Sequence, residues 1–248
     1  MGAALAALAA ACAFAASARA GAIACAPIGY SYAGLLSIRP AHGVTARITA
    51  LSQPNVRSGH VAAWVGVGGV GAGPDTTDEW LQVGVSAFPD HGVSLYYELA
   101  LPGKQPTYTA LGSDVQPGSG HNVAVLEMAN RSDYWRVWVD GSPKTQPIHL
   151  PASHGRLAPV ATAESWDGGA EVCNGYGFRF DSVKVAARAG GNWTPLASRT
   201  VLQDPGYHVK ELGLSSFLAG SRDGPLVKRS LYVGTAAKQY ASGQRLRH

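Results

Sequence analysis

The sequence lacks the common short motifs of catalytic and metal-binding sites. It contains no H-E-x-x-H, no G-x-S-x-G, no E-x-D-x-x-E strand and no close histidine pair, and its eight histidines are scattered. Zinc ligation therefore has no support, and nothing marks a Ser-His-Asp arrangement, although such residues need not be near one another in sequence. We expect neither a metal nor a cofactor.

A helical pattern is also missing. There is no heptad repeat and no convincing amphipathic helix, whereas glycine is abundant, with 31 residues among 248. Residues 66–71 match G-x-G-x-x-G, but the residues after Pro74 lead into a strand and not a helix. A dinucleotide site requires that helix, so the match is rejected. The composition favours an all-β fold, and the length suits one large β domain or two small ones.

Long apolar runs are absent after the first twenty residues. Ala3 to Ala16 is apolar, and Ala18-Arg19-Ala20 fits a signal-peptidase site, although no basic residue precedes the run. A membrane anchor is the alternative, but the run is too short to span a bilayer comfortably. We expect secretion after cleavage near Ala20, with no stable membrane insertion.

Cysteine is scarce as well. Of three cysteines, Cys12 lies in the expected signal, which leaves Cys25 and Cys173 in the mature chain. Because export implies an oxidising compartment, we predict that these two form a disulfide. The alternative is two separate thiols.

Positive charge is concentrated at the end of the chain. The net charge is +4, and residues 220–248 carry six basic residues against Asp223 alone, which leaves the body near neutral. No aromatic-basic interleaving accompanies this tail, so we expect no nucleic-acid binding. We divide the chain into a signal (1–20), a lead-in with the first strands (21–58), a β-sandwich (59–219) and a basic, flexible tail (220–248).

Short strands separated by turn-forming residues fill the middle of the chain. They predict an antiparallel sandwich of two sheets. A first pair of strands is expected near 35–38 and 44–51. The strongest strand signals are at 60–67, 79–88, 94–100, 122–128, 134–140, 158–166 and 176–187, and shorter strands are expected at 200–202, 207–212 and 215–218.

Four of these strands alternate in the same way. Side chains on a strand point to opposite faces with period two. In the strands at 60–67, 79–88, 94–100 and 158–166, one face is largely aliphatic and the other adds aromatic, amide or carboxylate groups. If the four strands share a sheet, the aromatic, amide and carboxylate side chains form one set that lines a single surface, as a cleft for an extended polymer would require. Its members are Trp64, Trp80, Gln82, Tyr96, Glu98, Glu164 and Trp166.

Four short motifs in order resemble a known family. They are Trp64-Val65-Gly66-Val67 with Gly69, Leu81-Gln82-Val83-Gly84-Val85, Tyr96-Tyr97-Glu98 and Thr162-Ala163-Glu164. Together they look like the glutamic peptidases, or eqolisins, and the chain would be a divergent, secreted, bacterial-type member. The resemblance covers roughly residues 59–185. It implies a concanavalin A-like (jelly-roll) β-sandwich that hydrolyses peptide bonds at acid pH without a metal.

The resemblance also assigns residues. It places the catalytic pair on Gln82 and Glu164, with Trp64 and Glu98 lining the cleft. A carboxylate at Glu164 could take a proton from the attacking water, and the Gln82 amide could bind that water and the developing oxyanion. Trp80, Tyr96 and Trp166 are the further candidates for substrate binding.

The sequence departs from the family pattern at three places. Gly68 and Ser86 stand where the family has aspartates, and Ser165 separates Glu164 from the tryptophan that follows it. Loss of the two acids could raise the pH optimum, or it could leave a cleft that binds without catalysis. We expect a monomer that hydrolyses a polypeptide substrate. One alternative is a sandwich that binds glycans or peptides without catalysis, and another is a purely structural domain.

Overall fold

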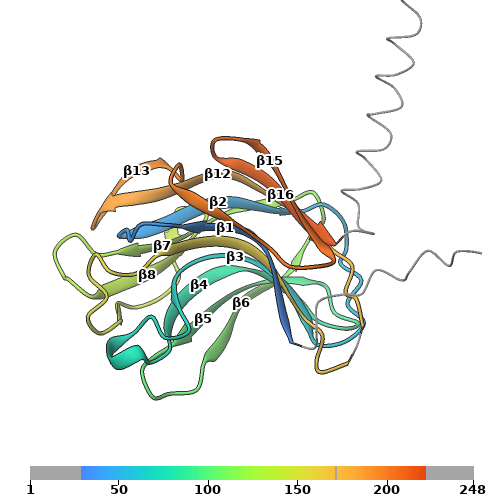
Figure 1. The fold of residues 1–248 in the computed structure, drawn as a ribbon, viewed down its shortest axis with the longest axis horizontal. Helices are drawn as coiled ribbons and strands as arrows, with labels where there is room; N and C mark the ends of the chain where they lie inside the picture. Colours follow the sequence, from blue (N-terminus) through green and yellow to red (C-terminus); the bar gives the residue numbers. More distant parts are fainter. Residues whose placement is uncertain (1–28, 171, 222–248) are drawn as a thin grey trace, which may run out of the picture.

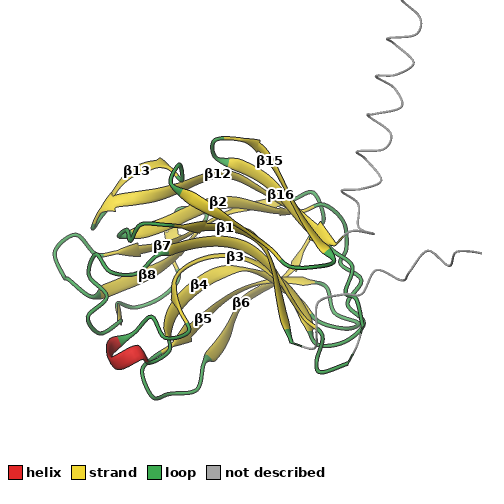
Figure 2. Ribbon diagram, in the orientation of Figure 1, coloured by secondary structure: helices red, strands yellow, loops and turns green. Residues whose placement is uncertain are grey.

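The computed structural model describes residues 29–170 and 172–221, which form a β-sandwich of two antiparallel sheets (Figure 1). Apart from one 3₁₀ turn at Pro74–Thr76, the regular elements in these ranges are all strands (Figure 2). The predicted all-β, concanavalin A-like jelly-roll architecture is therefore confirmed. The expected signal, Cys25 and nearly all of the basic tail lie outside the described residues.

The seven-stranded sheet contains the strands that the sequence singled out. Its spatial order is β14 (Arg199–Gln203), β1 (Tyr30–Ser37), β11 (Pro159–Trp166), β3 (His60–Gly69), β4 (Glu79–Ala87), β5 (Val93–Ala100) and β6 (Thr107–Val115). The four strands with shared alternation, β11, β3, β4 and β5, are thus consecutive neighbours, as the cleft hypothesis requires.

The nine-stranded sheet closes the sandwich. Its main order is β10 (Ile148–His149), β8 (Tyr134–Val139), β7 (Gly120–Glu127), β2 (Gly43–Ala50), β12 (Gly177–Arg188), β16 (Ser216–Ser221) and β15 (Tyr207–Gly213). In addition, β13 (Gly191–Pro195) pairs with β12, and β9 (Ser142–Pro143) pairs with β8.

The apolar faces of the two sheets meet in one core. On β3 and β4 the aliphatic residues of the predicted plain faces are fully buried, among them Val61, Val65, Leu81 and Val83. They pack in the same cluster as aromatic side chains of the nine-stranded sheet. The other face of β3 and β4 is therefore free to line a surface.

The expected pairing of the first two strands is wrong. Both strands form, but β1 pairs with β11 and β14 in one sheet, whereas β2 pairs with β7 and β12 in the other. The residues between them, 38–42, carry the chain across the sandwich instead of closing a hairpin. The range 21–58 therefore contributes an interior strand to each sheet.

Besides the two-residue strands β9 and β10, two longer strands, β6 and β13, were not expected. In β6 most side chains are exposed, and in β13 only Gly191 is buried. Neither strand has the alternation of buried apolar residues that reveals a strand in a sequence. No helix among the described residues is long and apolar enough to cross a membrane.

Candidate functional site

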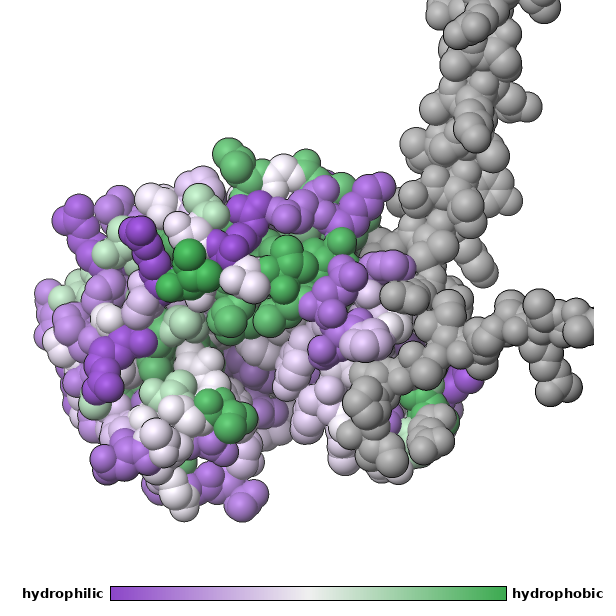
Figure 3. Space-filling view, in the orientation of Figure 1, coloured by the Kyte–Doolittle hydropathy of each residue, from purple (hydrophilic) through white to green (hydrophobic). Residues whose placement is uncertain are grey.

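A cleft of about 520 Å³ lies against the outer face of the seven-stranded sheet. Its lining includes five of the predicted residues, namely Trp64, Trp80, Gln82, Glu98 and Glu164. In the orientation of Figure 3, hydrophobic residues gather in the middle of the face shown, with hydrophilic residues around them. Because β11, β3, β4 and β5 are neighbours and alternate in the same way, the aromatic and polar side chains predicted to share one face do lie together.

Glu164 is held by two donors from the neighbouring strand. Its register partner on β3 is Ala62, so His60 and Trp64 stand two residues to either side, on the same face. Trp64 Nε1 donates to Glu164 Oε2 at 3.1 Å, and His60 Nε2 lies 3.0 Å from Glu164 Oε1. Glu164 is only 6% exposed. Each oxygen is anchored once and keeps a further lone pair for another partner.

Gln82 is also tethered by a neighbour. It lies opposite Gly66 on β3 and Glu98 on β5. Its Nε2 donates to the hydroxyl of Tyr96 at 3.1 Å. Because a carboxamide has two N–H groups and a carbonyl oxygen, one N–H and the oxygen stay available for a ligand in the cleft.

Tyr96 holds Gln82 from the neighbouring strand β5, on the same face of the sheet. It is 2% exposed and stacks on Tyr108, with ring centroids 5.0 Å apart. Burial raises the pKa of Tyr96 well above its ordinary value, so its hydroxyl keeps its proton. Tyr96 therefore holds the Gln82 amide and is not among the residues that line the cleft, and the substrate-binding role expected for it stays a prediction.

Glu98 supplies a second carboxyl group to the cleft. Trp80 Nε1 donates to Glu98 Oε1 at 2.9 Å. Burial raises the pKa of Glu98 above its ordinary value, the hydrogen bond from Trp80 lowers it, and the charge of Glu164 raises it. The cleft thus holds two carboxyl groups, and the charge of Glu164 favours the protonated form of Glu98.

Trp166 lies at one end of this face, outside the residues that line the cleft. It stacks on Tyr30 at 6.1 Å between ring centroids, and the His60 ring lies 5.6 Å away. Its exposed fraction is 37%, so part of the ring is accessible. The serine inserted before it does place Trp166 on the Glu164 face, as the strand period predicts.

Three residues at the site were not selected from the sequence. His60 contacts Glu164, Tyr32 is the register partner of Glu164 on β1, and Tyr108 supports Tyr96. Burial, then the charge of Glu164, raises the pKa of Tyr32. His60 could have been found, because it is in phase with Trp64 on the same strand. The other two could not, since Tyr32 lies before the strand expected at 35–38 and Tyr108 lies in β6, which was not expected.

The positions of the two missing aspartates have local explanations. Gly68 has φ +86°, and a Cβ there would meet the carbonyl oxygen of Glu79 at 2.2 Å, so an aspartate does not fit this backbone. Ser86 hydrogen-bonds the hydroxyl of Tyr108 at 2.9 Å. The backbone therefore excludes a side chain at position 68, whereas the Ser86 side chain has a partner in Tyr108.

Metal-ligating residues gather elsewhere. Among the described residues, the group of three His, Cys, Asp or Glu side chains close enough to share an ion consists of His42, Glu127 and His154, none of which lines the cleft. Cys25 lies outside the described residues, so its pairing with Cys173 stays a prediction.

No protein-family model and no curated protein matches the sequence. Among solved structures, the chain is similar to scytalido-glutamic peptidase bound to a peptide-based transition-state analogue, with a TM-score of 0.55 and 14% sequence identity. A second structure of that peptidase with a transition-state analogue inhibitor gives 0.53 and 15%. SCP-B, a member of the eqolisin family of peptidases in complex with the tripeptide Ala-Ile-His, gives 0.51 and 15%.

Each of these similarities covers 79% of this chain and 99% of the other chain. At such low identity they bear on the fold and not on the residues of the site. The sandwich described here has the fold of the eqolisin-type glutamic peptidases.

Proposed function

We propose that this chain is a secreted endopeptidase of the glutamic type, which hydrolyses peptide bonds with Gln82 and Glu164. The observation that carries the proposal is that both side chains are buried, line one cleft and are each hydrogen-bonded to a neighbouring side chain. A polypeptide substrate is further supported by the neighbours of the same fold, one solved with a peptide-based analogue and another with a tripeptide.

In this proposal Glu164 is the general base and then the general acid. Its ionised carboxylate takes a proton from a water molecule as the water oxygen attacks the scissile carbonyl carbon. The proton is then returned to the amine nitrogen as the C–N bond breaks. The hydrogen bonds from Trp64 and His60 keep both carboxylate oxygens oriented during this exchange.

Gln82 stabilises the charge that develops on the carbonyl oxygen. The N–H not used by Tyr96 is free to donate to the oxyanion of the tetrahedral intermediate, and its carbonyl oxygen can accept from the attacking water. Loss of one oxyanion donor typically costs about 100- to 1,000-fold in kcat.

The test is cleavage of a quenched fluorescent peptide library by the purified mature protein from acid to neutral pH. We expect Gln82→Ala to lower kcat about 100- to 1,000-fold and Glu164→Gln to abolish turnover. Tyr96→Phe, which frees the amide from its tether, should lower kcat roughly tenfold with little change in KM.

Matched controls are Gln146→Ala and Glu211→Gln, which make the same kinds of change at exposed positions outside the cleft. Both should retain wild-type kinetics. A folded wild-type sample that cleaves no peptide across this range refutes the proposal. If the same sample still binds peptides or glycans, and Trp80→Ala weakens that binding, the cleft is a recognition site without catalysis.

A further inference from the structure

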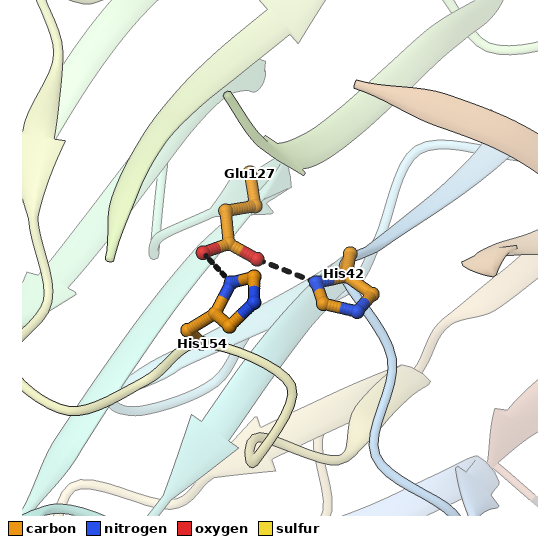
Figure 4. A group of neighbouring side chains, drawn as sticks. All are labelled: His42, Glu127 and His154. Carbon is orange, nitrogen blue, oxygen red and sulfur yellow. Dashed lines mark hydrogen bonds and ion pairs between the residues drawn. The ribbon is translucent and has the colours of Figure 1, made fainter. Parts of the chain in front are cut away.

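A second cluster of ionisable side chains lies outside the cleft (Figure 4). The carboxylate of Glu127 lies between two imidazoles, with Oε2 at 2.6 Å from His42 Nδ1 and Oε1 at 2.8 Å from His154 Nδ1. The two rings are tilted to one another, with centroids 5.0 Å apart. Both histidines therefore direct the same ring nitrogen toward one carboxylate.

Backbone hydrogen bonds fix the segments that carry these side chains. Glu127 ends β7, and its N–H donates to the carbonyl of His42, whose own N–H donates to Ala186 on β12. The N–H of His154 donates to Asp133, and the N–H of Asp133 donates to Glu127 Oε1. The nine-stranded sheet and the loop that follows β10 thus hold the three residues close together through backbone N–H groups, in addition to the contacts between their side chains.

The donor set is one that zinc prefers. Two imidazole nitrogens and a carboxylate are the protein ligands of a common open zinc site, in which a water molecule takes the fourth position. The three ligating atoms here lie within 4.8 Å of one another. In tetrahedral zinc coordination, ligand atoms are about 3.3 Å apart. The contacts of Glu127 with His42 and His154, at 2.6 and 2.8 Å, would need to open by about 0.7 and about 0.5 Å. The largest separation among the three ligating atoms, at most 4.8 Å, would need to close.

Burial in the cluster is uneven, which allows this adjustment. The Glu127 side chain has no exposed surface and that of His42 has 19%, whereas that of His154 has 51%. His154 can therefore move slightly and admit an ion from solvent, while Glu127 supplies a fixed negative charge. Neutral histidines would bind the ion through Nδ1 after the proton on that nitrogen moves to Nε2.

We propose that His42, Glu127 and His154 bind a divalent transition-metal ion, with Zn²⁺ as the best match. The bound ion ties the connection before β2, the end of β7 and the loop at 151–158 together. The sequence alone predicts no metal site, because the histidines that meet here lie 85 and 27 residues from Glu127.

The test is titration of the full chain, after treatment with a chelator, with Zn²⁺ against a chromogenic competitor. We expect one equivalent to bind with a Kd in the micromolar range or below. His154→Ala should weaken this binding at least tenfold, and the thermal unfolding midpoint should rise with Zn²⁺ in the wild type only. Because His154 is half exposed, the variant should fold, which circular dichroism checks.

The matched control is His91→Ala, which removes an exposed histidine outside the cluster and should bind Zn²⁺ like the wild type. Co²⁺ in place of Zn²⁺ should give the visible absorption of a tetrahedral site, and His154→Ala should lose it. Absence of saturable binding, or equal affinity in His154→Ala and wild type, overturns the proposal and leaves a hydrogen-bonded Glu127 with two histidine donors.

Discussion

Single polar residues divide between the two faces of β4. Gln82 points into the cleft, where it is nearly buried but hydrogen-bonded, whereas Glu79 points to the core side of the same strand. Glu79 has no exposed surface, and neither carboxyl oxygen has a hydrogen-bond partner among the described residues. Burying a charge without partners is costly, so Glu79 should be a weak point of the fold.

We predict that Glu79 makes stability fall as the pH rises. Burial raises its pKa to about 7, the charge of Asp133 also raises it, and Arg156 opposes the shift. Since the folded pKa is above the unfolded value of 4.5, the folded state gains from proton binding at acid pH. That contribution is complete below the unfolded pKa and is lost as the pH rises through about 7.

Urea unfolding at about pH 5 and about pH 8 measures the effect. Glu79→Gln should be more stable than the wild type at the higher pH by roughly 1–3 kcal/mol, and the difference should shrink at the lower pH. Asp90→Asn, which removes an exposed carboxylate without an ion-pair partner among the described residues, should show no such dependence. A constant difference between Glu79→Gln and wild type at both pH values would contradict the prediction.

At the scale of one strand, β4 lies very close to β3 at Gly84. Gly84 lies between Trp64 on β3 and Tyr96 on β5. A Cβ on Gly84 would meet the carbonyl oxygen of Ala63 at 2.0 Å and the Cα of Trp64 at 2.6 Å. The absence of a side chain therefore lets β3 and β4 approach and keeps Trp64 in place to donate to Glu164.

We predict that Gly84→Ala destabilises the fold by about 1–3 kcal/mol, because the added methyl group must push β3 away. The same displacement moves Trp64, so peptidase activity should fall further than stability explains. Gly112→Ala in β6 is the control, since nothing lies within 4 Å of the Cβ position there. Denaturant unfolding with an activity assay compares the two. Equal stability of the two variants would refute the tight-contact explanation.

At the scale of the whole molecule, the antiparallel pairing of β1 with β11 places the start of β1 beside the end of β11. Tyr30 is the register partner of Trp166, and the N–H of Gly29 lies 3.4 Å from Asp167 Oδ1. The chain before Tyr30 and the chain after Trp166 therefore leave the sheet at the same end. This topology supports the predicted pairing of Cys25 with Cys173.

We predict that reduction destabilises the mature protein by about 4–5 kcal/mol, because a disulfide across this long loop restricts the unfolded chain. Denatured protein should show no alkylated thiols by mass spectrometry until a reductant is added. The Cys25→Ser variant should unfold at the denaturant concentration of the reduced wild type. Two alkylated thiols in the unreduced mature protein would show that the cysteines are separate.

Much of the seven-stranded sheet was predictable from local pattern. Period-two alternation placed Gln82 and Glu164 on the face opposite Val83 and Ala163, because a strand with one buried face must alternate. The same rule could have included His60. It could not reveal β6, whose exposed side chains leave no apolar period to detect.

The sequence by itself determined the all-β class and the faces of the central strands, since both follow from the short-range geometry of an extended chain. Only the tertiary structure decided that β1 and β2 belong to different sheets, that Tyr96 hydrogen-bonds Gln82, and that His42 and His154 meet at Glu127. These relations depend on the order of strands within each sheet. That order is set by packing over long sequence separations, and a periodicity of two residues carries no information about it.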